Sequence, residues 1–200
     1  MKTIAAVFFA ISVILLATSL TEGADAQFYF DRAGTSFNEG QFDQAIRDYT
    51  QAISLSPHFT EAYYNRGQAH YRKGNLDEAI SDFTRVLDAM PGNAEIYNLR
   101  GLAFFRKGRY TDAIDDETKA ISLSPHLVAA YHNRGIAYAK NGQFDEAVAD
   151  YNKALSLKPD YTEAYFSRGV VYVRKATSDF RRACEKGNTL ACDNLKQLTQ

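Results

Sequence analysis

The heptapeptide AISLSPH occurs twice in the chain, at residues 52–58 and again at residues 120–126. The two copies begin 68 residues apart, which is two periods of 34. Self-similarity at a fixed period of roughly 20–50 residues is the signature of a protein built from repeated structural units. This period constrains the fold more than any other feature of the sequence.

A spacing of 34 residues orders almost the whole chain after Ala26. All four prolines recur at this spacing, together with turn glycines, buried-type glycines, alanines and tyrosines. These residues are Pro57, Pro91, Pro125 and Pro159; Gly40, Gly74, Gly108 and Gly142; Gly67, Gly101, Gly135 and Gly169; Ala45, Ala79, Ala113 and Ala147; and Tyr29, Tyr63, Tyr97, Tyr131 and Tyr165. Because so many registers agree, one structural unit is repeated.

Each period predicts two helices. In the second period, Tyr63, Gly67 and His70 follow the i, i+4, i+7 spacing of one helical face. Gly74 breaks that helix, and a second apolar stripe over residues 79–87 ends before Pro91, because proline cannot continue a helix. A single helix pair cannot bury both of its faces, so neighbouring pairs must stack.

The pattern strongly resembles the tetratricopeptide repeat. The signature of that family appears as Tyr131, Gly135, Tyr138, Ala147, Tyr151, Ala154 and Pro159. The resemblance implies an all-α fold, a right-handed α-solenoid of helix-turn-helix repeats whose first helices line a concave groove. It places four complete repeats at residues 26–59, 60–93, 94–127 and 128–161, a partial fifth repeat at residues 162–187 and a capping helix at residues 188–199.

The fifth repeat lacks five residues after Lys175, including the expected glycine turn. Either the chain makes a cramped turn near residues 175–177, or the two helices fuse. An unbroken apolar stripe favours one long helix that ends before Gly187; it consists of Tyr165, Gly169, Tyr172, Ala176, Phe180 and Ala183. The following terminal helix has Asn188 or Thr189 as a plausible N-cap.

The N-terminus has the organisation of a secretory signal peptide. Lys2 precedes an apolar run over residues 4–16, and a polar stretch then ends in the small-x-small pattern of residues 24–26. We expect cleavage after Ala26 and a periplasmic or secreted protein. The alternative is an uncleaved membrane anchor facing the periplasm, although residues 4–20 barely reach the ~20 residues that a spanning helix needs.

Without residues 1–26 the chain has 22 basic and 22 acidic residues and no net charge. Nucleic-acid binding usually requires a basic excess, which argues against that function. The two cysteines are Cys184 and Cys192, whose C-x7-C spacing resembles cysteine-bridged helical hairpins of some secreted bacterial repeat proteins. That resemblance favours a disulfide; the alternative is two buried, reduced cysteines.

Two polar features interrupt or accompany the apolar pattern. Glu117 stands where other repeats have an aromatic residue, and a carboxylate between packed helices costs free energy unless it is paired. We expect a local partner such as Lys119 or Arg134, with a functional notch as the alternative. Rows of opposite charge also recur, and we expect inter-helix salt bridges between them: Arg32, Arg66, Arg100, Arg134 and Arg168 with Asp48, Asp82, Asp116, Asp150 and Asp179.

No catalytic or cofactor motif is present in the sequence. The histidines His58, His70, His126 and His132 follow the repeat or stand alone, and metal-ligand and phosphate-loop patterns are missing. We therefore expect no enzymatic activity, no metal, no cofactor and no small-molecule substrate.

The family resemblance implies a groove for a protein or peptide partner, lined by fixed positions of each repeat. These positions hold Phe30, Phe37, Tyr64, Asn65, Gln68, Tyr71, Arg72, Asn98, Leu102, Phe105, Arg106, His132, Asn133, Ile136, Lys140, Phe166 and Arg174. Four of them, Arg72, Arg106, Lys140 and Arg174, share one register and form a cationic row beside aromatic residues. This pattern favours a peptide that carries apolar side chains and carboxylates, unless the row is simply a solvated edge.

Some family members clamp a chaperone C-terminus with Asn, Lys and Arg, but this chain does not keep those residues at the matching positions. The leading hypothesis is a non-enzymatic scaffold in the cell envelope. A membrane-tethered structural or assembly subunit is the alternative.

Overall fold

The computed structural model describes residues 25–199, and every regular element in that range is a helix. The predicted signal peptide, residues 1–26, lies outside the described residues except for its last two. Within the described range, no helix combines the length and apolar character that crossing a bilayer requires. The all-α prediction is confirmed.

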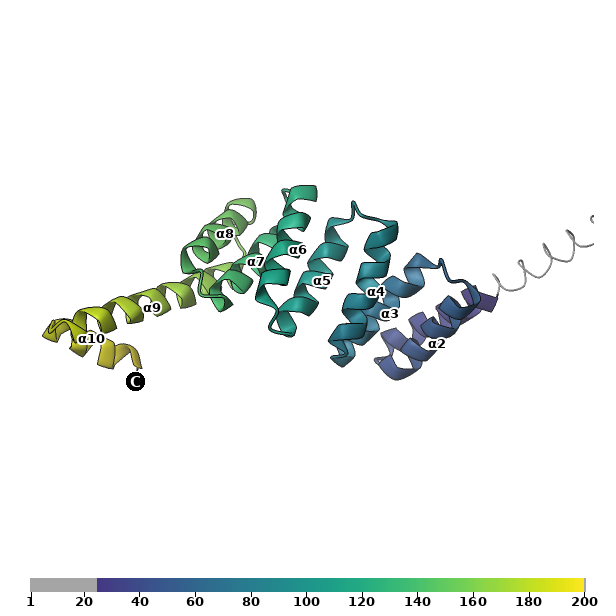
Figure 1. Cartoon of the computed structure of the whole chain (residues 1–200), viewed down its shortest axis with the longest axis horizontal. Coiled ribbons are helices and arrows are strands. Elements are labelled where there is room, and N and C mark those ends of the chain that lie inside the picture. Colours follow the sequence, from purple (N-terminus) through teal and green to yellow (C-terminus); the bar gives the residue numbers. More distant parts are fainter. Residues whose placement is uncertain (1–24, 200) are drawn as a thin grey trace, which may run out of the picture. The chain divides into compact units, whose positions relative to one another are not determined.

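The described residues divide into two compact units, 25–92 and 93–199. The first contains a helix whose described part covers residues 25–38, followed by α2 (Phe42–Leu55), α3 (Thr60–Lys73) and α4 (Leu76–Ala89). The second contains α5 (Ala94–Arg106), α6 (Tyr110–Leu123), α7 (Val128–Lys140), α8 (Phe144–Leu157), α9 (Thr162–Glu185) and α10 (Thr189–Thr199) (Figure 1). In each unit, consecutive helices pack in antiparallel pairs, as in helical solenoids.

The turns follow from local chemistry. Gly74 follows α3 with a φ of +93°, a left-handed conformation in which a side chain would be strained. The Gly74 N–H donates to the carbonyl oxygen of Tyr71, and the Asn75 N–H donates to that of His70. This left-handed turn lets α4 run back along α3.

Two helix pairs, α3 with α4 and α7 with α8, approach each other closely at a glycine. A Cβ atom added to Gly67 on α3 would lie 2.9 Å from Cε1 of Phe83 on α4. A Cβ atom on Gly135 of α7 would lie 2.6 Å from Cε1 of Tyr151 on α8. No side chain fits at these distances, so the missing side chain of glycine admits the aromatic ring of the partner helix.

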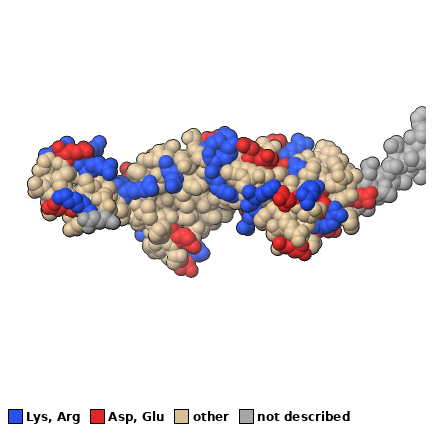
Figure 2. All heavy atoms as spheres, turned by 90° about the horizontal axis from the view of Figure 1, so that it is seen from below, with Lys and Arg blue, Asp and Glu red and all other residues tan. Residues whose placement is uncertain are grey.

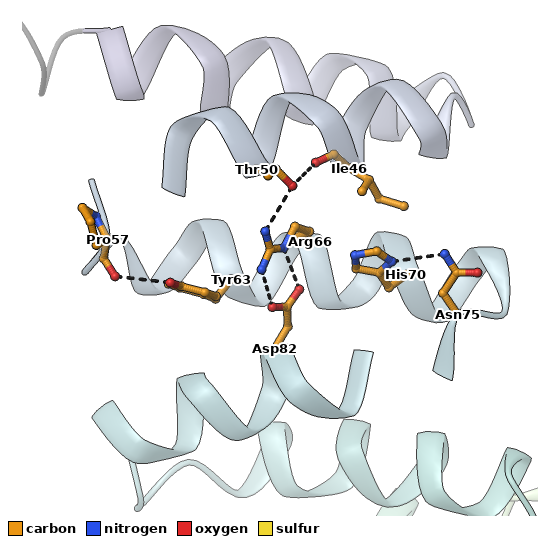
Figure 3. A network of polar contacts seen from close by, with 8 residues as sticks. All are labelled: Ile46, Thr50, Pro57, Tyr63, Arg66, His70, Asn75 and Asp82. Carbon is orange, nitrogen blue, oxygen red and sulfur yellow. Dashed lines mark hydrogen bonds and ion pairs between the residues drawn. The ribbon is translucent and has the colours of Figure 1, made fainter. Parts of the chain in front are cut away.

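The predicted inter-helix salt bridges form in four of the five repeats. In the second repeat, Arg66 Nε and Nη2 donate to the two carboxylate oxygens of Asp82 at 2.8 and 2.7 Å (Figure 3). Arg66 Nη1 also donates to Thr50 of the preceding helix at 3.1 Å. The same two-pronged contact joins Arg32 to Asp48, Arg100 to Asp116 and Arg134 to Asp150.

The expected fifth pair, Arg168 with Asp179, is wrong. Both residues lie on α9, where Asp179 is three turns further along the same helix and cannot fold back. Arg168 Nη1 instead donates to Asn152 Oδ1 on α8.

α9 is a single helix of 24 residues, which confirms the long-helix prediction and excludes a reversal at Lys175. The following turn uses Gly187, and Asn188 caps α10 by accepting a hydrogen bond from the Ala191 N–H at 3.0 Å. A disulfide joins Cys184 to Cys192 across this turn, so the alternative of two reduced cysteines is rejected. The bond fixes α10 against the end of α9.

A matched pair of glycine substitutions tests the close-approach contact. Gly135→Ala should lower the free energy of unfolding by about 1–3 kcal/mol, because the new methyl group displaces the Tyr151 ring. Gly169→Ala should raise it by up to about 1 kcal/mol, because no atom lies within 4 Å and alanine favours the helix. Chemical denaturation measures both values, and equal effects would contradict this packing.

Candidate partner-binding groove

Predicted groove residues of α5, α7 and α9 come together in the second unit around two pockets. The smaller has a volume of about 60 Å³ and is lined by Gly101, Leu102, Phe105, Ala113, Glu117, Asn133 and Ile136. The larger has a volume of about 200 Å³ and is lined by Ile136, Ala139, Lys140, Tyr151, Phe166, Ser167, Val170, Val171 and Arg174. Ile136 belongs to both, so the two pockets adjoin each other on the same side of α7.

The smaller pocket exists because Glu117 replaces an aromatic residue. In the following repeat, the ring of Tyr151 fills the space over Gly135. In this repeat, Glu117 Oε1 lies 3.0 Å from the Cβ position of Gly101, and the rest of the ring volume stays empty. A carboxyl group is smaller than a phenol ring, so the substitution hollows the groove floor.

Glu117 is only 1% exposed, and its neighbours are amides. The side-chain amide of Asn98 lies 3.1 Å from Glu117 Oε2. Asn133 Nδ2 donates to Asn98 Oδ1 at 2.8 Å, and Asn133 also hydrogen-bonds to the acid. The expected ion pair with Lys119 or Arg134 is wrong, because the Arg134 guanidinium is engaged by Asp150 and Thr118.

Burial raises the pKa of the Glu117 carboxyl to about 9, and the adjacent Asp116 carboxylate adds to this shift. The Asn133 hydrogen bond and the Arg134 charge oppose it without reversing it. The acid is therefore neutral at pH 7 and can donate its proton to Asn98 Oδ1. The groove floor here is polar but uncharged.

The larger pocket has a cationic and aromatic border. Phe166 on α9 is 75% exposed, and Lys140 and Arg174 are also exposed. Arg106, one repeat earlier on α5, is exposed as well. These four predicted residues are accessible to a partner.

His132 differs from the other predicted groove residues of this unit. Its ring is buried, with Nε2 3.1 Å from Ser167 Oγ and Nδ1 3.2 Å from the Tyr161 hydroxyl. Burial lowers the pKa of this ring, which keeps it neutral at pH 7. His132 thus joins α7 to α9 and helps to set the spacing of the groove.

In the first unit, the predicted groove residues share less of a common cavity. Phe30 packs on Tyr49 and Phe59, with ring centroids 5.6 and 4.7 Å apart, and Phe37 packs on Phe42. Four predicted residues of α3 are half-buried and one, at its end, is exposed: Tyr64, Asn65, Gln68, Tyr71 and Arg72. The described pockets of the groove side lie in the second unit.

On the face drawn in Figure 2, each unit has charged side chains of both signs. Within residues 25–199, no cluster of three or more His, Cys, Asp or Glu side chains is arranged to hold a metal ion.

Two family models match the chain. The model described as "TPR repeat" matches residues 101–142 and 137–175, and the model described as "Tetratricopeptide repeat" matches residues 30–94. Together they cover more than half of the chain. The protein belongs to the tetratricopeptide repeat family.

Several solved structures are similar to the protein. A crystal structure of MamA is 28% identical, with a TM-score of 0.73, covering 88% of this chain and 91% of MamA. The first repeat domain of Spaghetti (RPAP3), bound to the HSP90 peptide SRMEEVD, is 29% identical, with a TM-score of 0.57, covering 58% of this chain and 93% of that domain. The Arabidopsis OM64 domain is 28% identical, with a TM-score of 0.54, covering 56% of this chain and 93% of that domain. No curated protein sequence matches.

Glu117→Gln tests the neutral acid. The Glu117 pKa is about 9 in the folded protein and near 4.5 in the unfolded chain, so only the unfolded state loses this proton between those pH values. The free energy of unfolding of the wild-type protein should therefore fall relative to that of Glu117→Gln as the pH rises from about 5 to 9. Denaturation at several pH values measures the difference. A pH-independent difference between the wild-type protein and Glu117→Gln would contradict burial of the acid.

Proposed function

We propose that the protein is a non-enzymatic interaction module that binds a peptide or protein segment in the groove of its second unit. The observation that carries this proposal is the pocket of about 200 Å³ with exposed Phe166, Lys140 and Arg174 at its edge. An exposed aromatic side chain next to an open pocket is a typical anchor of a protein interface. The solved structure of RPAP3 with a bound peptide supports this use of the fold.

The chemistry of the groove defines the partner. Val170 and Ile136 offer apolar contact, and Lys140, Arg174 and Arg106 offer cations at one register of successive first helices. Glu117 is uncharged at pH 7 and does not repel a carboxylate. The groove therefore suits a segment with an apolar anchor flanked by acidic side chains.

We also propose that the protein works in the cell envelope, in the periplasm or as a secreted protein. The signal-like residues 1–26 support this location, and the Cys184–Cys192 disulfide suits an oxidising compartment. The membrane-tethered structural or assembly subunit is the second candidate, in which residues 4–20 stay attached as an anchor.

Charge reversal tests the groove. A Lys140→Glu/Arg174→Glu variant should lose the partner that the native protein captures from envelope extract, because its groove now repels carboxylates. The matched control Lys119→Glu/Lys153→Glu makes the same change in charge on exposed positions of second helices and should retain the partner. Equal capture by both variants, quantified by mass spectrometry, would refute the choice of groove.

The two candidate locations predict different N-termini. N-terminal sequencing of the protein from its native cells should begin at Gln27 if the leader is removed. Recovery of the intact chain, beginning at Met1, in the membrane fraction would favour the tethered subunit.

A further inference from the structure

α9 exposes to solvent the face that α7 uses to hold α8. On α7 this face is centred on Tyr131, Gly135 and Tyr138, and Tyr131 is only 8% exposed. The equivalent Tyr165 on α9 is 49% exposed and Tyr172 is 50% exposed. The shortened fifth repeat explains the difference, because the residues that would turn back as a second helix continue along α9 instead (Figure 1).

The exposed face repeats the glycine of the occupied ones. Gly67 and Gly135 each receive an aromatic ring from a second helix at less than 3.0 Å from their Cβ positions. Gly169 keeps the same register but has no atom of the described chain within 4 Å. The glycine that admits a ring on α3 and α7 is thus repeated on α9, where no ring of the described chain meets it.

The exposed face of α9 also keeps the arginine of the occupied faces. In the fourth repeat, Arg134 Nη1 donates a hydrogen bond to Thr118 of the preceding helix, α6. Its Nε and Nη2 donate to the carboxylate of Asp150 on α8, the second helix of the same repeat. Arg168 keeps the first of these contacts, through Nη1 to Asn152. Among the described residues, no carboxylate takes the place that Asp150 has beside Arg134, so this edge of the guanidinium suits an incoming acid.

The occupied faces define what fits. Two aromatic second helices, α8 and α2, have an acid immediately before the ring and alanines four before and three after it, and α4 has Val86 at the last of these positions. In α8 these are Ala147, Asp150, Tyr151 and Ala154, and in α2 they are Ala45, Asp48, Tyr49 and Ala52. The remaining helix, α10, contains no aromatic residue and is held at the far end of α9 by the disulfide.

We propose that the face of Tyr165, Arg168, Gly169 and Tyr172 is a docking site for an amphipathic helix of another protein that carries an Asp-aromatic pair flanked by small residues. The helix completes the fifth repeat in trans: its ring packs on Gly169 and its carboxylate pairs with Arg168. This site lies on a different side of α9 from Phe166 and Arg174 and does not depend on the groove.

A peptide copy of α8 is the probe. A fluorescent peptide of residues 143–158, with Ala149→Glu joined to Lys153 by a lactam bridge on its outer side to hold it helical, is titrated against the full protein by anisotropy. We expect saturable binding, weakened at least tenfold by Tyr151→Ala and also weakened by Asp150→Asn in the peptide. Absence of binding would overturn the proposal.

Protein variants locate the binding. Gly169→Leu should weaken it at least tenfold, because the new side chain takes the space that the incoming ring needs; its Cβ atom meets nothing within 4 Å. The melting temperature of this variant should stay at or above that of the wild-type protein, which separates loss of the site from loss of the fold. Arg168→Gln should weaken binding to the same degree as Asp150→Asn in the peptide. The groove variant Lys140→Glu/Arg174→Glu should bind as the native protein does. Loss of binding in the groove variant, with Gly169→Leu unaffected, would place the peptide in the groove and overturn the site.

Sedimentation velocity distinguishes a partner from a second copy. The native protein should remain monomeric as its concentration rises. A concentration-dependent dimer that Gly169→Leu abolishes would overturn the proposed partner in favour of self-association through the same face.

Discussion

Close approach of a small residue on one helix to the next helix, with an Arg–Asp pair beside it, is the constraint on which the other features depend; at Gly67 and Gly135 the partner is an aromatic ring. At Gly135 the ring of Tyr151 lies closer than any side chain would allow, and the Arg134–Asp150 pair closes the contact on one side. Both contacts join residues 16 apart, so they fix the register of the two helices together. Arg134 and Asp150 are largely buried, which makes loss of either partner costly.

The candidate groove follows from this constraint and from one exception to it. Because α8 is held on one side of α7, another side of α7 is left to form the pockets around Ile136 with residues of α5 and α9. Glu117 replaces the aromatic ring found at this position in other repeats. Its neutral carboxyl lies with Asn98 and Asn133 beside a small pocket, where a ring would otherwise fill the space. A residue of a second helix, Glu117 on α6, thus changes the shape of the groove floor.

The fold was predictable because the period of 34 fixes the register of every helix pair. The stripe from Tyr165 onward predicted the length of α9 for the same reason, since a helical face needs no long-range information. The hydrogen-bond partners of Glu117 could not be predicted from the sequence. They depend on the three-dimensional meeting of Asn98 from α5 and Asn133 from α7, whereas the residues adjacent in sequence suggested a charged partner.

The prediction of a fifth salt bridge was wrong because the charge pattern does not show whether the chain turns back. The registers of Arg168 and Asp179 continue the two charged rows, but five missing residues convert a hairpin into a continuous helix, which separates the two side chains by three turns. The deletion that lengthens α9 therefore also uncovers its face.

Double-mutant cycles on two pairs test the central claim most directly. Alanine substitutions of Arg134 and Asp150, singly and together, should give a coupling energy of about 2 kcal/mol, because the pair is buried between two helices. The same cycle on Arg168 and Asp179 should give a value close to zero. Equal coupling in both pairs would show that the fifth repeat closes on itself like the others, and would contradict the account.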